Sequence, residues 1–299
     1  MLALIAGLGD LPPALVARLP TRPLICALQG FTPAIVPDVT FRLEHLGTLI
    51  ARLSSEGVTQ ICMAGAVRRP EIDPSEIDDL TKPLVPKVMA ALGQGDDSAL
   101  RIIISVFEDA GFSVVAAHEI APDLLPDAGV LTRIAPADEH LADALAGAVC
   151  IAEMGTMDMG QACLIRSGLV IAKEGPDGTD ALLGAQGDVH QTHGARGFVD
   201  DIADNALSIF DSAADLMVGK AKRGLDLNGA ILFKAPKPTQ DWRADLPVIG
   251  LGTAERAVQV GLSGIVIEAA GVMVLDLPTV IEKLDASGLF LWVRPKGAS

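Results

Sequence analysis

The sequence predicts an α/β protein with two α/β domains in tandem, the N-terminal one Rossmann-like with a parallel sheet and the C-terminal one with a mixed sheet. Short aliphatic runs alternate with segments of helical spacing before residue 121, which is typical of a parallel sheet covered on both faces. The pattern lapses over residues 121–137, where Pro and Gly accumulate, and strands and helices resume afterwards. Such a stretch is typical of a linker. We therefore expect domains at residues 1–132 and 133–299.

The first domain is expected to contain four strands, because four short aliphatic runs are bounded by Gly, Pro or polar residues. These runs are residues 2–6, 24–28, 60–66 and 113–117. Apolar residues recur at helical spacing between them. The helices expected from this spacing cover residues 13–19, 43–53, 84–92 and 98–110.

The second domain opens with a predicted helix over residues 138–153, whose acidic first residues suit the positive end of a helix dipole. Residues 162–165 and 169–172 flank Arg-Ser-Gly, which predicts a β-hairpin. The remaining elements expected are a helix at 278–286 and strands at 230–233, 248–251, 264–267, 272–275 and 289–293. Residues 184–197 lack periodicity and predict a loop; its His190 and His193 have no carboxylate or Cys at metal-binding spacing.

Composition and charge exclude several classes of protein. Of the 299 residues, 50% are hydrophobic and 20% are charged, with 23 basic against 38 acidic side chains and a net charge of −15. This hydrophobic content excludes intrinsic disorder. The acidic balance counts against a nucleic-acid binder and against a protein held on anionic lipid by a basic face.

Cysteine usage and hydropathy favour a cytoplasmic protein. The four cysteines form no C-x-x-C pair, so neither a zinc ribbon nor a disulfide framework is indicated. Cys26, Cys62 and Cys163 each lie in an apolar run and are predicted to be buried. No apolar run reaches the roughly 18 residues of a membrane span, and the first residues lack the basic start of a signal peptide.

A glycine-rich turn follows the first predicted strand, with the sequence Gly7-Leu-Gly-Asp-Leu-Pro12. Two glycines in this position allow a backbone to approach a phosphate at a helix N-terminus. Pro12 stands where the dinucleotide-binding pattern has its third glycine, so the match is partial. An ordinary tight turn between strand and helix explains the segment equally well.

Acidic and histidine side chains follow two further elements. Asp96 and Asp97 precede a predicted helix and could coordinate Mg²⁺ through one oxygen each, although a helix cap is favoured on composition alone. His118 and Glu119 are expected at the end of strand 113–117, at the sheet edge where open α/β sheets bind ligands. A hydrogen-bonded structural histidine is the alternative.

The strongest candidate site is the segment Lys234-Ala-Pro-Lys237-Pro-Thr-Gln240, followed by Arg243-Ala-Asp245. Prolines stiffen this loop, and it gathers three cations in an acidic chain, which favours phosphate binding over a plain surface connection. Asp245 could hold a metal or polarise water. Another segment, 174–180, combines acids, Gly and Thr179; metal or hydroxyl recognition and a turn with a helix cap remain equally open there.

A series of segments, in order over essentially the whole chain, resembles the UDP-2,3-diacylglucosamine diphosphatase (pyrophosphatase) family of lipid A biosynthesis, in its metal-dependent form with two α/β domains. K-A-P-K-P-x-Q followed by R-x-D-L-P-x-I-G is the specific part of the match. The segments are residues 5–12, 63–70, 95–101, 117–119, 158–161, 178–181, 234–240, 243–250 and 261–268. Two features depart from the family: Asp177 stands in Asp-Gly-Thr-Asp180 where the family has E-G-T-D, and the loop of His190 and His193 matches no family feature.

The resemblance implies hydrolysis of the pyrophosphate bond of UDP-2,3-diacylglucosamine to 2,3-diacylglucosamine 1-phosphate (lipid X) and UMP, in the synthesis of the lipid A of lipopolysaccharide. Water would attack the α-phosphorus, and Mg²⁺ or another divalent cation would be the cofactor. This implication agrees with the residues, because hydrolysis of a phosphoanhydride needs a metal ion, cationic side chains and an aligned water molecule.

The resemblance also implies roles for individual residues. Asp245 would be a metal ligand or orient the water, Asp96 and Asp97 would be further metal contacts, and Asp180 a catalytic, metal or ribose contact. The diphosphate would be bound by Lys234, Lys237 and Arg243. Hydrogen bonds to the substrate would come from Gln161, Thr179 and Gln240. The nucleotide or sugar end would contact Gly7, Gly9, Leu11, Gly65 and Arg68.

A substrate with two acyl chains needs an apolar chamber, for which a cleft between two domains is the natural position. We therefore expect transient peripheral contact with the inner membrane by a cytoplasmic protein, and a homodimer is compatible with this picture. Two other classes stay open. A Rossmann-type NAD(P)-dependent oxidoreductase would use the Gly7 turn and needs a ribose reader near residue 30, where Gln29 and Gly30 supply none. A non-catalytic nucleotide-sugar or lipid-binding protein would share the pocket but not the metal.

Overall fold

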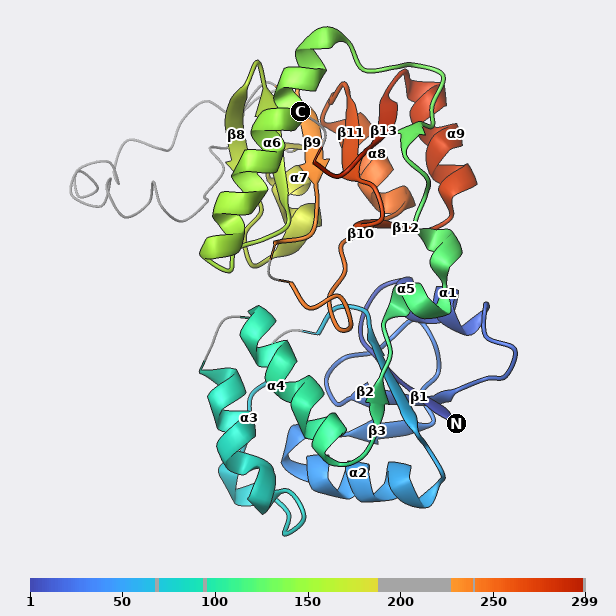
Figure 1. The fold of residues 1–299 in the computed structure, drawn as a ribbon, viewed down its shortest axis with the longest axis vertical. Helices are drawn as coiled ribbons and strands as arrows, with labels where there is room; N and C mark the ends of the chain where they lie inside the picture. The colour runs from blue at the N-terminus through green and yellow to red at the C-terminus, as the bar shows by residue number, and fades with distance from the viewer. Residues whose placement is uncertain (68–69, 94–95, 188–226, 239, 298–299) are drawn as a thin grey trace, which may run out of the picture. The chain divides into compact units, whose positions relative to one another are not determined.

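The computed structural model describes residues 1–67, 70–93, 96–187, 227–238 and 240–297. The chain divides into two compact units. The first unit is Met1–Leu125 together with Thr239–Leu246, and the second is Pro126–Pro238 together with Pro247–Ser299 (Figure 1). The short segment that contains Arg243 and Asp245 therefore belongs to the first unit, although most of the chain around it belongs to the second.

The first unit is built on a parallel sheet of five strands in the order β3-β2-β1-β4-β5. The strands are β1 (Leu2–Ala6), β2 (Leu24–Leu28), β3 (Val39–Phe41), β4 (Gln60–Ala64) and β5 (Ser113–Val114). This is the Rossmann-like arrangement that the alternation of strands and helices predicts. The short strand β3 has no counterpart in the sequence prediction.

Helices cover this sheet on both faces. The elements are α1 (Leu11–Val16), η1 (Leu43–His45), α2 (Leu46–Ser55), η2 (Pro74–Glu76), η3 (Lys82–Leu84), α3 (Val85–Leu92), α4 (Asp96–Asp109), α5 (Ala117–Ile120) and η4 (Pro122–Leu124). Leu53 of α2 and Phe107 of α4 pack in one core cluster with Ala3 of β1. Because side chains alternate along a strand, Leu4 and Ile25 point to the opposite face, and both are fully buried there.

The strand expected over residues 113–117 is too long. β5 ends at Val114, and His118 and Glu119 lie in the short helix α5 and not at the end of a strand. Glu119 explains the difference, because its Oε2 accepts a hydrogen bond of 2.8 Å from the backbone N–H of Ala116. This side-chain bond satisfies the Ala116 N–H at the start of a helical turn. In a strand, the same N–H would need an acceptor on a neighbouring strand.

The second unit is built on a mixed sheet of six strands in the order β6-β13-β11-β9-β7-β8. Its strands are β6 (Gly129–Val130), β7 (Ala162–Arg166), β8 (Leu169–Lys173), β9 (Ile231–Lys234), β11 (Gly264–Glu268) and β13 (Phe290–Arg294). The three strands β9, β11 and β13 are parallel, and β7 and β8 form the predicted antiparallel hairpin. β10 (Val248–Ile249) and β12 (Met273–Val274) form a separate parallel pair.

The stretch predicted as a linker contributes to this sheet. Gly129 and Val130 form the edge strand β6, which pairs antiparallel with β13. Two residues are too few for a periodic pattern to reveal a strand, so the pairing depends on the tertiary neighbour.

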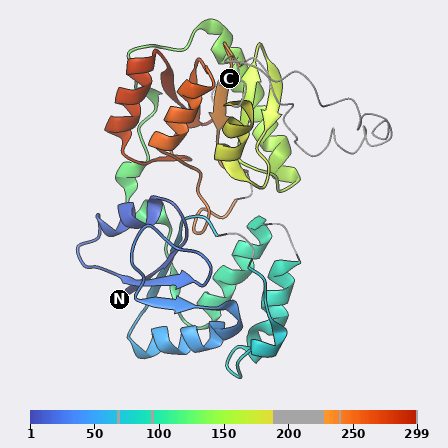
Figure 2. The same cartoon turned by 180° about the vertical axis from the view of Figure 1, so that it is seen from behind.

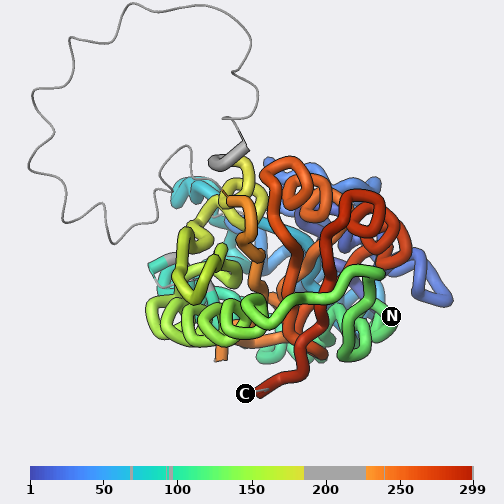
Figure 3. Tube along the Cα trace, turned by 90° about the horizontal axis from the view of Figure 1, so that it is seen from above, coloured from blue at the N-terminus to red at the C-terminus, as the bar shows by residue number. Residues whose placement is uncertain are grey.

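One long helix covers one face of the second sheet, and three helices cover the other. α6 (Asp138–Thr156) lies in front of the sheet in Figure 1. α8 (Leu251–Gln259) and α9 (Leu277–Ser287) lie on the opposite face, which is turned toward the viewer in Figure 2, and Figure 3 shows the layers from above. α7 (Gly178–Gly187) lies on the side of α8 and α9. Along β9, Phe233 belongs to the core under α6 and Leu232 to the core under the three helices. By the same alternation, Lys234 points toward α7.

The four cysteines are free thiols and all are buried, as predicted for Cys26, Cys62 and Cys163. Burial raises the pKa of Cys26 and of Cys62 to about 12. Thiols with such a raised pKa are inert small hydrophobes and not nucleophiles. No helix in the described part of the chain is long and apolar enough to cross a lipid bilayer.

Candidate active site

Two loops meet at the carboxyl ends of β1 and β4, where the strand order of the first sheet reverses. The backbone N–H of Gly7 donates to the carbonyl of Ala64 at 2.8 Å, and Leu8 and Ala66 exchange two backbone hydrogen bonds of 2.8 and 3.0 Å. The Gly7 turn and the Gly65 loop, which lie more than fifty residues apart in the sequence, are therefore neighbours. This reversal point is where open α/β sheets bind their ligands.

The glycines of these loops have a structural reason of their own. A Cβ on Gly7 would lie 2.6 Å from the carbonyl oxygen of Ala66, and a Cβ on Gly65 would lie 2.7 Å from that of Leu8. Both residues are therefore required where the two backbones touch. Gly9 has open space around it, and Leu11 is buried at the start of the six-residue helix α1. Arg68, predicted to bind substrate, lies outside the described residues.

The segment that carries Asp245 is anchored in the first unit by Asp97. This side chain is buried, forms an ion pair with Arg101, and accepts a 3.1 Å hydrogen bond from the backbone N–H of Asp241. Asp97 thus joins the start of α4 to residues 240–246. Asp96 begins α4, and its side chain is not among those described.

Arg243 forms ion pairs with two carboxylates. Its guanidinium lies 2.7 Å from Asp241 and 2.7 Å from Glu108. The hydrogen bonds to Asp241 raise the pKa of Arg243, and the same guanidinium lowers the pKa of Asp241. A phosphate would have to compete with these carboxylates for Arg243.

Asp245 is oriented by an amide. Nε2 of the buried Gln240 donates to Oδ2 of Asp245 at 2.5 Å, and the backbone N–H of Asp245 donates to the carbonyl of Asp241 at 3.2 Å. This hydrogen bond orients the carboxylate of Asp245. A carboxylate oriented in this way can hold a metal ion or accept a hydrogen bond from water.

The second unit contains a buried relay of polar groups, which we call the Lys234 relay: Glu174, Thr179 and Lys234. The three residues are 6%, 7% and 7% exposed. Nζ of Lys234 donates to the hydroxyl of Thr179 at 2.7 Å, and that hydroxyl donates to Oε1 of Glu174 at 2.5 Å. The carbonyl of Val248 accepts a further 3.1 Å bond from the same ammonium.

Lys237 is held differently. Its ammonium lies 2.5 Å from Oδ1 of Asp158, a direct ion pair, and Lys237 is as buried as Lys234. Asp158 has a φ of 50°, in the left-handed region that non-glycine residues rarely adopt. The ion pair contributes to holding this conformation.

Gln161 is partly buried, whereas Asp180 is exposed. The backbone N–H of Gln161 donates to Glu174, and its carbonyl accepts from Ala235 at 3.1 Å, so its backbone joins the end of β9 to the Lys234 relay. Asp180 is exposed on α7 and lies 2.8 Å from the guanidinium of Arg256 on α8. The structure therefore brings Gln161, Thr179 and Lys234 together but leaves Asp180 on the surface.

Three residues to which the resemblance gives no role pair with predicted site residues: Asp158, Glu174 and Asp241. His118, expected near a ligand-binding sheet edge, has its ring 6.1 Å from that of Trp242, and its buried Nδ1 has no hydrogen-bond partner among the described residues. Such an unsatisfied atom is an unusual feature that a ligand or water commonly explains. The sequence signal for Asp158 is its place in a segment that resembles the family, and for Glu174 its place in the segment 174–180. The loop with His190 and His193 lies outside the described residues.

The residues predicted to bind metal fit that role unequally. Within the described residues no group of three His, Cys, Asp or Glu side chains is arranged to hold a metal ion. Mg²⁺ in phosphate-binding sites is often held by only one or two carboxylates together with substrate oxygens and water. Asp245 fits this requirement, whereas Asp97 already serves Arg101 and the Asp241 amide, which a metal ion would displace.

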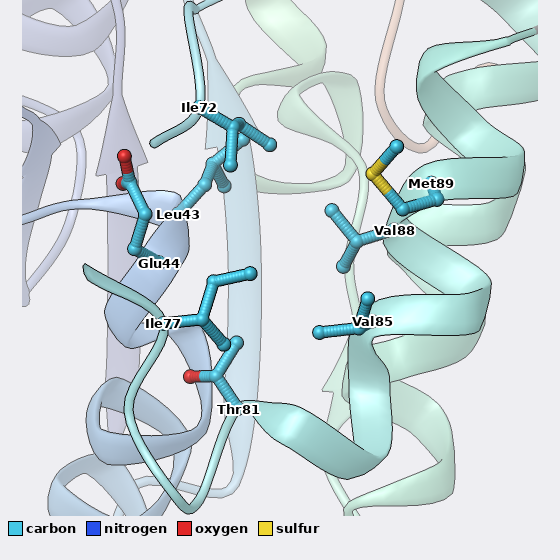
Figure 4. Close-up of a pocket in the computed structure, with 8 residues that line it drawn as sticks. All are labelled: Leu43, Glu44, Ile72, Ile77, Thr81, Val85, Val88 and Met89. Atoms are coloured by element: carbon cyan, nitrogen blue, oxygen red, sulfur yellow. The ribbon is translucent and has the colours of Figure 1, made fainter. Parts of the chain in front are cut away.

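An aliphatic pocket lies in the first unit between η1, α3 and the segment 72–81. Figure 4 shows Ile72 and Ile77 facing Val85, Val88 and Met89 of α3. The space accessible to a water-sized probe is about 10 Å³, which is room for about one water molecule and not for an acyl chain.

Comparison with known proteins now adds to this geometry. The family model of the LpxI N-terminal domain matches residues 1–124, and that of the LpxI C-terminal domain matches residues 127–200 and 210–292. The chain belongs to the LpxI family. It is 33% identical over 296 residues to the UDP-2,3-diacylglucosamine pyrophosphatase LpxI of Caulobacter vibrioides, across 97% of this chain and 96% of that protein. The resemblance inferred from the sequence motifs is thereby confirmed, and the match gives no support to the alternative of an NAD(P)-dependent oxidoreductase.

Proposed function

We propose that this chain is a UDP-2,3-diacylglucosamine pyrophosphatase of lipid A biosynthesis, a hydrolase that releases UMP and 2,3-diacylglucosamine 1-phosphate. The observation that carries the proposal is the full-length similarity to the LpxI protein of Caulobacter vibrioides, which bears that name. The chemistry of the candidate residues in each unit supports it, because a buried ammonium and an oriented carboxylate are groups that hydrolysis of a phosphoanhydride uses.

Each candidate residue has a role that follows from its chemistry. Lys234 donates hydrogen bonds to diphosphate oxygens and balances the charge that develops on them, and Lys237 adds positive charge from the same loop. Asp245, held by Gln240, orients the attacking water or holds the metal ion. A bound Mg²⁺ would polarise the phosphoryl oxygens. Gly9 and the loop around Gly65 supply backbone groups at the reversal point of the first sheet for the nucleotide or the sugar.

The direct test is hydrolysis of UDP-2,3-diacylglucosamine by the purified chain with Mg²⁺, followed as release of UMP. Turnover is expected, and EDTA is expected to abolish it until excess Mg²⁺ is restored. Binding of the substrate without turnover would instead identify a nucleotide-sugar or lipid-binding protein. Turnover that persists in EDTA would remove the metal from the proposal but not the reaction.

The position of attack can be measured in the same assay. We place attack at the α-phosphorus, as the resemblance implies. In water enriched in ¹⁸O, attack at the α-phosphorus transfers the label to UMP, whereas attack at the β-phosphorus transfers it to the sugar 1-phosphate. Mass spectrometry of the two products separates the outcomes, and label in the sugar phosphate would overturn this part of the proposal.

We also place the enzyme on the cytoplasmic side of the inner membrane, with transient contact, because its substrate carries two acyl chains. The aliphatic pocket of Figure 4 is too small for a chain as it stands, so binding would need Met89 and Ile72 to move apart. Sedimentation with vesicles of neutral phospholipid tests the contact. We expect weak binding that increases when the substrate is incorporated in the vesicle.

We further propose that the chain is a homodimer through the outer face of α6. Leu141, Leu145 and Val149 are 43%, 42% and 60% exposed there. Between Glu139 and Glu153 the only Asp, Glu, Lys or Arg of α6 is Asp143, which is buried. Exposed apolar patches of this kind mark interaction sites, and an uncharged face is where two copies of a chain of charge −15 repel each other least.

Light scattering of the purified protein tests the dimer. Val149→Asp is expected to convert dimers to monomers, while Leu80→Asp, at another exposed apolar residue in the first unit, is expected to leave them intact. A wild-type chain that is monomeric at micromolar concentration would overturn the proposal.

A further inference from the structure

Two lysines of the same loop are equally buried but have different counter-ions. Lys237 forms a direct ion pair with Asp158 at 2.5 Å. Lys234 reaches Glu174 only through the hydroxyl of Thr179, by bonds of 2.7 and 2.5 Å. The sequence predicts that both residues are phosphate-binding cations. Their surroundings differ in the acceptors that each ammonium contacts.

The hydroxyl in the Lys234 relay has a specific consequence. Because the Thr179 hydroxyl donates its hydrogen to Glu174, its oxygen is left to accept from Lys234. An ammonium has three N–H groups, and those of Lys234 have two acceptors among the described residues, Thr179 and the carbonyl of Val248. One N–H therefore remains for an anion, while Glu174 supplies negative charge on the far side of the Thr179 hydroxyl.

Glu174 is itself held tightly in place. Its other carboxylate oxygen accepts from the backbone N–H of Gln161. Glycine at position 160 makes this approach feasible, because a Cβ there would lie 2.7 Å from the Glu174 side chain. The carboxylate is therefore oriented by β7 and α7 together, and it cannot swing to form a direct pair with Lys234 without breaking both bonds.

We infer that Glu174, acting through Thr179, is a positioning residue that holds Lys234 directed at the substrate diphosphate. This inference rests on the proposed function. It also separates the two lysines, because Lys237 contributes mainly to the stability of the loop through Asp158. A direct Lys234–Glu174 pair would place a carboxylate where the phosphate must bind, and the intervening hydroxyl avoids that competition.

The other charged groups around Lys234 are already paired or lie at the surface. On α7 the exposed Asp180 pairs with Arg256 of α8. At the end of β11, Glu268 lies 3.9 Å from Lys296. β10 contributes the Val248 carbonyl, and on β7 the register partner of Lys234 is Ala162. Glu174 is therefore the carboxylate whose removal is expected to affect Lys234 most.

The test uses inorganic pyrophosphate as the probe and measures its affinity by calorimetry. Lys234→Met, Glu174→Gln and Thr179→Val are each expected to weaken binding by about tenfold or more, the loss expected for a charge-assisted hydrogen bond. Thr179→Ser keeps the hydroxyl and is expected to bind like the wild type. Glu153→Gln, at an exposed glutamate 4.0 Å from Lys173, is the matched control.

Rescue by the conservative variant distinguishes positioning from simple support of the fold. Thr179→Ser restores the hydroxyl between Lys234 and Glu174, so its affinity is expected to exceed that of Thr179→Val, whereas Glu153→Gln keeps the wild-type affinity. Glu174→Gln with wild-type affinity, or Thr179→Ser as weak as Thr179→Val, would overturn the inference. If Glu174→Gln fails to fold, the comparison of Thr179→Ser with Thr179→Val alone decides. Absence of hydrolysis by the wild-type chain would refute the proposed function, whatever the pyrophosphate results.

Discussion

The ion pair of Asp97 in the first unit and the Lys234 relay in the second show two ways of placing a buried charge opposite its counter-ion. Asp97 contacts Arg101 directly, as Asp241 contacts Arg243 and Glu44 contacts Arg42. In the second unit the buried Lys234 is separated from Glu174 by a hydroxyl. A direct pair satisfies both partners and stabilises the fold, whereas a pair separated by a hydroxyl leaves binding capacity on the cation. The difference shows that charge alone does not identify which residues bind substrate.

Asp245 accepts a hydrogen bond from the amide of Gln240, and its substitution tests the comparison most strongly. We expect Asp245→Asn to lower kcat by about 10² to 10⁴-fold, the usual contribution of a group that acts on a proton in the transition state, with an unchanged melting temperature. Steady-state turnover with Mg²⁺ measures this. Asp123→Asn, at an exposed partner of Arg18, is the control, and near-wild-type turnover of Asp245→Asn would refute the role.

The second prediction separates the two lysines. Lys234→Met is expected to lower kcat/KM by about 10²-fold, as the loss of one preorganised donor to a developing charge does. It is also expected to lower stability, because it leaves the buried Glu174 without its cation and the Val248 carbonyl without this donor. Lys237→Met leaves Asp158 without its ammonium and is expected to lower the free energy of unfolding by about 1–3 kcal/mol. Denaturant unfolding and kinetics on both variants measure the two effects. A larger loss of kcat/KM in Lys237→Met than in Lys234→Met would contradict this separation of roles.

The third prediction concerns acid stability of the first unit. Hydrogen bonds from Arg42 lower the pKa of the buried Glu44 from 4.5 to about 2. The folded pKa lies below the unfolded one, so this stabilisation is present above pH 4.5 and is lost as the pH falls toward 2. We expect a loss on the order of 1–3 kcal/mol across that window. In Glu44→Gln the same loss is expected to be present already at neutral pH, and the slope between pH 4.5 and 2 is expected to flatten.

Unfolding by urea at a series of pH values checks this slope. Arg133 pairs with Asp285 in the second unit, so Asp285→Asn serves as a carboxylate control outside the first unit. Equal slopes for the wild type and Glu44→Gln would contradict the prediction.

We expect the smallest effect at Arg243, because Asp241 and Glu108 compete with phosphate for its guanidinium. Glu108→Gln removes one of two competing carboxylates from a half-exposed pair. If Arg243 binds the diphosphate, KM is expected to fall by roughly 1.5- to 5-fold, which corresponds to the 0.2–1 kcal/mol of an exposed ion pair. An unchanged KM would indicate that Arg243 holds the segment 240–246 and does not bind substrate.

Periodicity predicted most of the elements, because aliphatic runs and helical spacing record burial locally. It failed where a long-range partner decides the structure. The edge strand at Gly129 and Val130 exists only because β13 lies beside it. His118 was assigned to a strand end because the hydrogen bond from Ala116 to Glu119, which starts a helix, leaves no periodic signal. Motifs identified Lys234, Lys237 and Asp245 as candidates, but no pattern in the sequence distinguishes a direct ion pair from a relay.

The sequence by itself determined the α/β class, the two kinds of sheet and, through its motifs, the family. These depend on side-chain periodicity and on short contiguous segments. Only the tertiary structure decided that residues 239–246 belong to the first unit and that Asp97 anchors this segment. It also explains why positions 7 and 65 need glycine, because a Cβ at Gly7 or Gly65 would clash with the backbone of the other loop. It also decided that Thr179 stands between Glu174 and Lys234. Apart from Thr179 and Glu174, such contacts join residues tens to more than a hundred positions apart, and their geometry depends on packing that no local pattern records.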